Sequence, residues 1–470
     1  MVVGGGISGL SAAWRAVQLA QERGLALDLT LLEARGRLGG TIESERTDGF
    51  LLEAGPDSFI SEKPWALDLC RELGIEHRLV RTDDRFRRTY VWSRGRLHPL
   101  PDGFQLLAPT RLGPFVGSAL FSWPGKLRMA LEVALPRGGG LRPHVVDTDE
   151  SLGSFVRRRL GAEALERVAQ PLVAGIYTAD PDELSLAATM PRFLELERSE
   201  RSVILALWRA GRRTPQPGTS GARWSLFLTF KDGMGELVGA LAARLPAGAV
   251  VLEQRVTGIE RIGPAWRVIT AGGSSIAADR VIVATEAPVT ARLLRYVDPA
   301  VAALLSDIPY ASSATVTVAY RRPEIPHPLD GFGFVVPRVE GRAILACTFS
   351  SVKYPGRAPE GMALFRCFLG GALDTRVLAG SDDDLLATAR AELRLALGVT
   401  AAPILSRVHR WPFAMPQYRV GHLDRIAAIM RAVDGMPGLL LAGGGYRGVG
   451  ISDCVHSGAT AAARALGVVA

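Results

Sequence analysis

The 470-residue sequence predicts an α/β fold whose main domain contains a parallel sheet. Three observations predict this fold. A strand, a glycine-rich turn and a helix follow one another at the N-terminus, and the same order returns near the C-terminus. Between them, residues 279–285 read as a further strand of the buried, parallel type. We therefore expect the main domain to be assembled from at least three separated segments.

The N-terminal turn carries the pattern G-x-G-x-x-G between Val2-Val3 and a helix expected over 10–19. Gly4 permits the tight turn, Gly6 lets the backbone approach a pyrophosphate, and Gly9 lets the helix lie close on the strand. The N–H groups of the first helical turn point at the phosphates. A second strand, expected over 27–32, ends in Glu33, whose carboxylate can accept hydrogen bonds from adenosine ribose hydroxyls and repels a 2′-phosphate. The region therefore predicts a dinucleotide site that disfavours NADP.

The residues after Glu33 favour FAD. Residues 34–41 form a glycine-rich basic loop, where an NAD-binding domain usually begins another crossover. Arg35 and Arg37 can neutralise a diphosphate, and Gly39-Gly40 allow the backbone to approach a flat ring. Alone, this loop and the stretch 51–57 also fit ordinary surface loops.

The C-terminal pattern weighs against that simpler interpretation. An apolar strand at 439–442 is followed by a glycine turn at 443–450 and an alanine-rich helix expected over 451–466. The N-terminus of such a helix suits the electron-rich N1/O2 edge of a reduced isoalloxazine. The two ends of the chain together predict a flavin site.

Composition narrows the class of protein. A hydrophobic content of 48% and a charged content of 22% are globular values, and the length suffices for two or three domains. The net charge of +8 comes almost entirely from scattered arginines, so anionic substrates or anionic lipid explain it better than nucleic acid does. The four cysteines form no C-x-x-C, which fits a reduced compartment without disulfides or zinc. We expect neither a signal peptide nor a transmembrane helix.

Residues 101–207 are expected to be mainly helical. From Phe104 to Leu135, aromatic and aliphatic residues lie beside cations such as Lys126. This mixture suits a helix pair in a membrane interface, and it equally suits an amphipathic pair packed on its own domain. A single amphipathic helix is expected from Glu150 to Leu165.

The rest of the chain predicts a hairpin and a second sheet. Residues 89–97 read as a hairpin with Arg94 at or beside its turn. Short strands separated by turns predict a mostly antiparallel sheet from 314–320, 333–336, 343–348 and 363–369.

Motifs for protein-based nucleophiles, metal cages and Walker-type phosphate loops do not occur. The sequence has no H-E-x-x-H, no G-x-S-x-G and no G-K-[ST], and its seven histidines are isolated. We therefore assign no catalytic side chain and no metal site, and expect the flavin to carry the chemistry.

The motifs at the two ends of the chain resemble the flavin amine oxidase superfamily. Within it, the sequence is similar to the oxygen-dependent protoporphyrinogen oxidases of haem biosynthesis, particularly the bacterial type. Further matching stretches run through the chain in the order found in that family: 51–59, 175–185, 331–337, 410–412, 415–418 and 446–454.

The resemblance implies site residues at matching positions. Residues implied to line FAD are Gly4, Gly5, Gly6, Ile7, Ser8, Gly9, Glu33, Ala34, Gly40, Gly55, Pro56, Asp57, Ser58, Val256, Trp411, Gly450, Ile451 and Ser452. Arg94 is implied to clamp a propionate of the tetrapyrrole by a charge-assisted pair. Val335 and Phe368 are implied to sandwich the macrocycle, with Gly175 leaving room for it.

Two positions depart from the family pattern. Asp57 stands where related enzymes often carry an uncharged or basic residue, and a carboxylate there would repel a propionate. Gly445 stands where amine oxidases with covalent flavin carry a cysteine, so we expect FAD to be held noncovalently.

The resemblance also implies three domains. An FAD-binding Rossmann-like domain is expected from 1–77, 227–290 and 405–470, and a substrate-binding domain with a mixed or antiparallel sheet from 78–100, 205–226 and 291–404. Residues 101–204 are expected to form an α-helical membrane-binding domain. That expectation favours peripheral attachment at the inner face of the cell membrane of an otherwise cytoplasmic protein.

The expected activity is a six-electron oxidation of protoporphyrinogen IX in three two-electron steps, with a hydride passed to flavin N5 and dioxygen reduced to hydrogen peroxide. Coproporphyrinogen III is the alternative substrate, and its four propionates need more cationic contacts than the two of protoporphyrinogen. More distant alternatives are another amine oxidase, a carotenoid desaturase and a non-enzymatic binder of a lipidated partner. A homodimer is possible.

Overall fold

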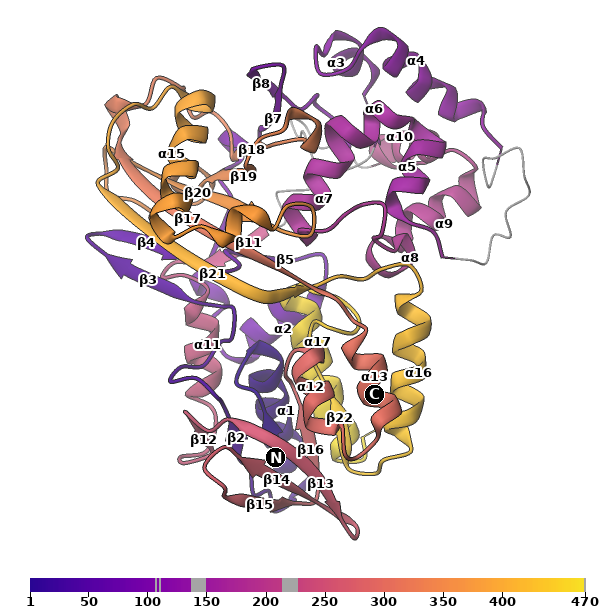
Figure 1. Cartoon of the computed structure of the whole chain (residues 1–470), viewed down its shortest axis with the longest axis vertical. Coiled ribbons are helices and arrows are strands. Elements are labelled where there is room, and N and C mark those ends of the chain that lie inside the picture. Colours follow the sequence, from indigo (N-terminus) through magenta and orange to yellow (C-terminus); the bar gives the residue numbers. More distant parts are fainter. Residues whose placement is uncertain (106–107, 110, 137–148, 214–226, 469–470) are drawn as a thin grey trace.

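The structure is a computed structural model that describes residues 1–105, 108–109, 111–136, 149–213 and 227–468. It has a mixed α/β fold with several sheets. In Figure 1 the parallel sheet and its helices form the lower half, a larger sheet lies at the upper left and a helical lobe at the upper right.

The parallel sheet joins three separated parts of the chain, as predicted. Its strands pair in parallel throughout, because each connection crosses over before the next strand. In spatial order they are β12 (Val250–Val251), β2 (Leu31–Leu32), β1 (Val2–Val3), β16 (Val281–Val283) and β22 (Leu439–Leu441). The second strand is shorter than the predicted 27–32.

Helices cover one face of this sheet and share one apolar core with it. They are α1 (Ile7–Arg23), α2 (Pro64–Glu72), α11 (Gly235–Ala242) and α17 (Ile451–Ala465). Helix α1 is longer than the predicted 10–19. A Cβ on Gly458 of α17 would lie 2.1 Å from the carbonyl oxygen of Ser8, so only glycine lets α17 lie this close to α1.

The opposite face packs against a small antiparallel sheet and further helices. The sheet consists of β13 (Val256–Ile262), β14 (Ala265–Thr270) and β15 (Ser275–Ala278). The helices are α12 (Ala287–Leu294), α13 (Pro299–Ser306) and α16 (His422–Asp434). Helix α13 belongs to this core although the predicted boundary at 290 assigns it to the substrate domain.

A seven-stranded sheet forms the second layer and is antiparallel except between β18 and β7. Its order is β21 (Leu405–Pro416), β17 (Tyr310–Arg321), β20 (Met362–Gly370), β19 (Ile344–Phe349), β18 (Gly333–Val335), β7 (Thr89–Ser93) and β8 (Arg96–Pro99). Helix α15 (Asp382–Leu397) packs on it and the short α14 (Ser350–Lys353) follows β19. Strand β21 opens the segment 405–470, predicted to bind FAD, but its hydrogen bonds go to β17 in this sheet.

Two small sheets connect these layers. Strands β3 (Ser44–Thr47) and β4 (Phe50–Glu53) form a hairpin, and β11 (Phe227–Phe230) lies between β5 (Phe59–Ile60) and β6 (Leu79–Arg81).

The helical lobe corrects two predicted elements. The expected helix pair over 104–135 begins instead with a hairpin of β9 (Phe104–Gln105) and β10 (Ala108–Pro109), and the helix expected over 150–165 stops at Leu160 because Gly161 has φ +96°. A π-helical turn, Leu165–Ala169, precedes α7. The helices are α3 (Leu112–Gly117), α4 (Trp123–Ala130), α5 (Leu152–Leu160), α6 (Ala162–Ala164), α7 (Gln170–Tyr177), α8 (Leu186–Thr189), α9 (Pro191–Glu200) and α10 (Val203–Arg213).

Helix α10 carries the first residues of the predicted substrate segment 205–226, and residues 214–226 lie outside the described part of the chain. Among the described residues, no helix is both long and apolar enough to cross a membrane.

Candidate active site

The turn between β1 and α1 is shaped by the glycines that the sequence singled out. Gly4 has φ +106°, a conformation that side chains disfavour. A Cβ on Gly9 would lie 1.9 Å from the carbonyl oxygen of Gly4, so the helix can sit this close to the strand only with glycine. The predicted role of Gly9 in helix–strand packing is confirmed.

Glu33 lies at the end of β2 and closes the same turn. Its Oε2 accepts a hydrogen bond from the Gly5 amide at 2.7 Å, and its Oε1 accepts one from the Arg35 amide at 2.8 Å. A carboxylate oxygen has more than one lone pair, so both can still accept a ribose hydroxyl. The two amides hold the carboxylate in place at 9% exposure.

Two helices begin beside the predicted site without a side-chain cap. Gly6 precedes α1 and Gly450 precedes α17, and neither helix start has a hydrogen bond from a capping side chain. The first N–H groups of a helix carry partial positive charge, so each helix can bind an anionic group of a ligand.

A glycine-lined cradle lies between the first turn and the loop after β2. Gly6 forms a β-bridge with Gly39, and a Cβ on Gly40 would lie 3.2 Å from the Gly6 Cα. The facing backbones carry no side chains here, which suits close approach of a flat or diphosphate group.

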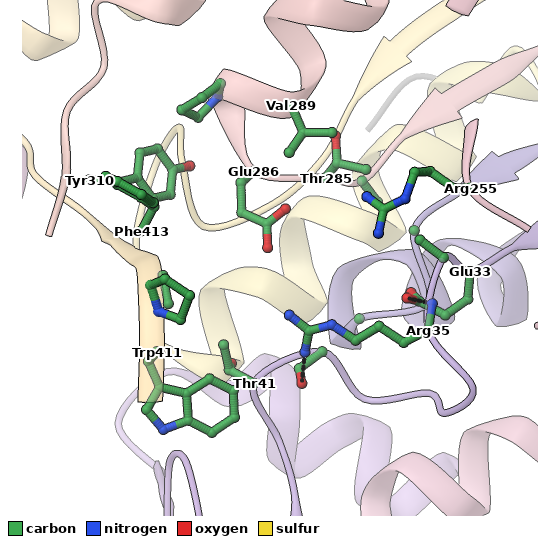
Figure 2. A pocket seen from close by; sticks show the side chains of 18 of the residues that line it. Glu33, Arg35, Thr41, Arg255, Thr285, Glu286, Val289, Tyr310, Trp411 and Phe413 are labelled. Atoms are coloured by element: carbon green, nitrogen blue, oxygen red, sulfur yellow. Dashed lines mark hydrogen bonds between the residues drawn. The ribbon is translucent and has the colours of Figure 1, made fainter. Parts of the chain in front are cut away.

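This cradle opens into a cavity of about 1180 Å³, larger than a typical ligand pocket. In Figure 2, Glu33, Arg35 and Arg255 lie on one side, Tyr310, Trp411 and Phe413 on the other, and the Glu286 carboxylate between them. The cavity thus offers cations and aromatic rings together.

The structure brings only part of the predicted FAD set to this cavity. The predicted residues that line the cavity are Gly4, Gly6, Glu33, Ala34, Gly40, Val256 and Trp411. The predicted residues that do not line the cavity are Gly5, Ile7, Ser8, Gly9, Gly55, Pro56, Asp57, Ser58, Gly450, Ile451 and Ser452. Lining residues that sequence reasoning did not single out include Arg255, Glu286 and Tyr310, which no motif marks.

The segment 54–58 is fixed behind Trp411. The Trp411 indole N–H and the Thr315 hydroxyl both donate to the carbonyl oxygen of Ala54, each at 2.9 Å. A Cβ on Gly55 would lie 1.9 Å from the Thr41 carbonyl oxygen and 3.7 Å from the Trp411 ring. This tight packing explains the glycine without a direct ligand contact.

Asp57, whose carboxylate was expected to repel a propionate, is paired with two cations. Lys353 Nζ lies 3.0 Å from one of its oxygens and Arg366 lies 3.4 Å away. Burial alone would raise the pKa of the Asp57 carboxyl, but the Lys353 and Arg366 charges hold it well below its usual range. Sequence reasoning missed both cations because they lie some 300 residues away.

The implied substrate residues meet between α7 and the seven-stranded sheet. A Cβ on Gly175 would lie 4.0 Å from the Val335 side chain, and Val335 and Phe368 belong to one apolar cluster with Tyr418. Gly175 itself is exposed and Phe368 is half-buried, so this part of the cluster reaches solvent.

Arg94 is not part of that apolar cluster but follows the cluster residue Val91, in the exposed turn between β7 and β8, with φ +52°. Its amide donates to Glu340 at 3.1 Å, and its side chain is exposed. The predicted position in the hairpin turn is confirmed.

Tyr418 joins the substrate cluster to the C-terminal glycine turn. Its hydroxyl donates to the Gly444 carbonyl oxygen at 2.5 Å and accepts from the Gly448 amide at 2.8 Å. Its ring stacks on His422, whose Nε2 lies 2.9 Å from the Tyr446 carbonyl oxygen. The sequence marked this residue only as part of a family stretch.

These features fit FAD: a glycine cradle without Cβ atoms, the uncapped N-terminus of α1, arginines for a diphosphate and a cavity of sufficient size. The described residues hold no group of three or more side chains that could bind a metal ion. The fold and site therefore define a flavin-dependent oxidoreductase.

A protein-family model described as flavin containing amine oxidoreductase matches residues 7–466, and the chain belongs to this family. The predicted superfamily and the FAD cofactor are thereby confirmed.

Within this family, the chain is similar to enzymes named as porphyrinogen oxidases. Coproporphyrinogen III oxidase of Bacillus subtilis (strain 168) is 35% identical over 467 residues, covering 99% of this chain and 97% of the relative. Chloroplastic protoporphyrinogen oxidase of Nicotiana tabacum is 31% identical over 477 residues, covering 97% and 83%. A crystal structure from Exiguobacterium sp. 255-15, assigned as a protoporphyrinogen oxidase, superposes with a TM-score of 0.86 at 32% identity, covering 98% and 97%.

Proposed function

We propose that this protein oxidises coproporphyrinogen III to coproporphyrin III with FAD, as a step of haem biosynthesis. Porphyrinogen oxidation is supported by the relatives named coproporphyrinogen III oxidase and protoporphyrinogen oxidase, which match nearly the whole chain. Two relatives that are 35% and 36% identical to the chain carry the coproporphyrinogen name. Sequence alone favoured protoporphyrinogen IX, so the proposal changes the order of the two substrates.

The observation that carries this choice is an arginine rim beside the implied substrate site. Val335 of β18 pairs with Val91 of β7, so the two parallel strands end side by side and lead into Arg338 and Arg94. The π-helical turn brings Arg167 against Ser93, 3.2 Å away, and against Glu340. The members of the arginine rim are Arg94, Arg96, Arg167 and Arg338.

Two carboxylates face these four arginines: Glu340 pairs with Arg167, and Asp374, which pairs with Arg376, also interacts with the charge of Arg338. The rim therefore keeps an excess of positive charge. Four propionates gain more from such a rim than two, because each charge-assisted pair adds to affinity.

In this proposal the residues of the chain bind and orient the substrate. Val335 and Phe368 pack against the macrocycle faces, Gly175 leaves room beside α7, and Arg94 pairs with a propionate. Bound FAD supplies two-electron oxidation, and three such events with dioxygen as acceptor would yield the porphyrin and three molecules of hydrogen peroxide.

Protoporphyrinogen IX is the second candidate. Relatives from tobacco and cattle that carry the protoporphyrinogen oxidase name are 31% and 33% identical to the chain. Its two propionates would engage only part of the arginine rim.

We also propose that the protein is cytoplasmic and attaches peripherally to the membrane through the helical lobe. Val116, Trp123, Leu127 and Leu131 expose 47 to 65% of their surface on neighbouring helices. Trp123, Leu127 and Leu131 repeat at helical spacing, and Lys126 lies over the Trp123 ring at 4.6 Å. An exposed apolar stripe suits a membrane interface, while Lys126 itself is buried and donates to the Val116 carbonyl oxygen at 2.7 Å.

The test is anaerobic mixing of the holoenzyme with each porphyrinogen, followed by admission of air. We expect flavin bleaching and porphyrin fluorescence with both, and a kcat/KM at least tenfold higher for coproporphyrinogen III. Equal or reversed preference would overturn the substrate choice. No bleaching with either would overturn porphyrinogen oxidation, and amine and carotenoid substrates would then be tried.

A further inference from the structure

A buried charge cluster lies between the segment 53–57 and the seven-stranded sheet. Its cations are Lys353, Arg357 and Arg366, and its carboxylates are Glu53 and Asp57. Each of the three cations exposes 8% or less of its surface. We call this set the Asp57 cluster.

The charges of the Asp57 cluster do not balance. Lys353 and Arg366 pair with Asp57, while Arg357 lies 3.8 Å from Glu53. Burial raises the pKa of the Glu53 carboxyl, which further weakens the negative side. Three cations against two carboxylates leave at least one positive charge in excess, and a buried charge without a partner is costly.

Hydrogen bonding within the cluster is also incomplete. One arm of Arg366 donates to the carbonyl oxygens of Glu53 and Gly55, at 3.0 and 2.6 Å, and Arg357 donates to the Thr229 hydroxyl at 2.6 Å. Arg366 Nε and Arg357 Nη1 are buried, and no described atom accepts from them. A purely structural network is normally satisfied, so these donors point to an anionic acceptor.

The Asp57 cluster adjoins the implied substrate site. The Arg366 guanidinium stacks on the Phe368 ring at 4.8 Å, so it lies directly behind a residue implied to sandwich the macrocycle. The Lys353 and Asp57 side chains keep 9% and 14% of their surface exposed, and Phe368 is half-buried. An anion approaching past Phe368 can therefore reach the edge of the cluster.

We infer that the Asp57 cluster is a carboxylate-binding subsite that holds a propionate of the substrate on the opposite side of the macrocycle from the arginine rim. The subsite rests on the proposed function, because a tetrapyrrole with carboxylates on several edges is the ligand that needs two cationic sites. Asp57 sets the strength of the subsite by neutralising part of its charge.

The charge of the cluster makes the inference testable by binding alone. Coproporphyrin III and its tetramethyl ester are titrated into the holoenzyme and followed by quenching of porphyrin fluorescence. Lys353→Met removes one positive charge and is expected to weaken coproporphyrin III binding about tenfold. Asp57→Asn adds one and is expected to strengthen binding several-fold, and the double variant is expected to stay near wild type. The ester is expected to bind all variants alike.

Lys231→Met is the matched control, since it removes a lysine from an exposed turn and leaves the cluster intact. FAD content and circular dichroism check folding, and the double variant keeps the original charge balance if a single variant does not fold. Affinity that does not follow the cluster charge, or an ester that responds as the acid does, overturns the subsite. Wild-type protein that binds neither ligand overturns the proposed function and the subsite together.

Discussion

Substituting Gly40 tests whether the glycine cradle holds FAD. Gly40 has φ +62°, and a Cβ there would lie 3.2 Å from the Gly6 Cα, closer than an ordinary van der Waals contact. Gly24, the residue after α1, has nearly the same φ of +64°, but a Cβ there meets nothing within 4 Å. Gly40→Ala and Gly24→Ala therefore share the backbone strain and differ in the crowding.

The backbone strain that Gly40→Ala and Gly24→Ala share can be estimated from their positive φ. An L-residue in the left-handed region costs roughly 1–2 kcal/mol, so both variants should lose about that much unfolding free energy. Gly40→Ala must also push its loop away from Gly6 by a few tenths of an ångström, which adds about 1 kcal/mol of overpacking and widens the cradle. We expect FAD affinity to fall about tenfold or more in Gly40→Ala only.

The assay is titration of the apoprotein with FAD, followed by quenching of flavin fluorescence, with thermal unfolding of both apoproteins measured alongside. Similar stability losses with a selective loss of FAD affinity in Gly40→Ala support the reasoning. If Gly24→Ala lost FAD equally, or Gly40→Ala bound FAD as wild type does, the cradle would not be a cofactor contact.

Three further outcomes are expected. Arg94→Ala should raise the KM for coproporphyrinogen III about tenfold with unchanged FAD content, because one charge-assisted pair is lost; an unchanged KM would remove Arg94 from the substrate site. Replacing Trp123 and Leu127 together by serine should abolish sedimentation with anionic phospholipid vesicles, whereas serine at Leu395, 56% exposed on α15, should not; equal losses would contradict docking through α4. Burial raises the pKa of the Cys70 thiol to about 12, so the stability that the buried neutral thiol contributes is present below about pH 9 and is lost as the pH rises further. The unfolding free energy measured in urea should therefore fall less steeply from pH 9 to 11 in Cys70→Ala than in wild type.

The sequence predicted well those features that depend on neighbouring residues. Gly4 and Gly9 act within one turn, and Arg94 stands in a hairpin whose two strands are adjacent in the chain. The parallel sheet followed from short apolar runs, because buried strands have few other compositions. Such patterns can be read locally.

Features that depend on distant residues were not predictable from one sequence. Asp57 was interpreted as a departure from the family pattern, because no residue close to it in the sequence indicates that Lys353 and Arg366 pair with it in the fold. The helix expected over 150–165 failed at Gly161 for a different reason: apolar spacing continues through a glycine whose positive φ ends the helix.

Strand β17 explains how the fold sets the distance between cofactor and substrate. Its Ser313 pairs with Trp411 of β21, and its Thr315 pairs with Phe368 of β20, so one strand lies between a residue of the FAD cavity and a residue of the implied substrate site. The Thr315 hydroxyl also donates to the Ala54 carbonyl oxygen that receives the Trp411 indole N–H. Long antiparallel ladders hold β17 on both edges, to β20 and to β21. A displacement of either neighbouring strand should therefore be resisted by the whole sheet. The seven-stranded sheet is thus the rigid element on which both sites depend.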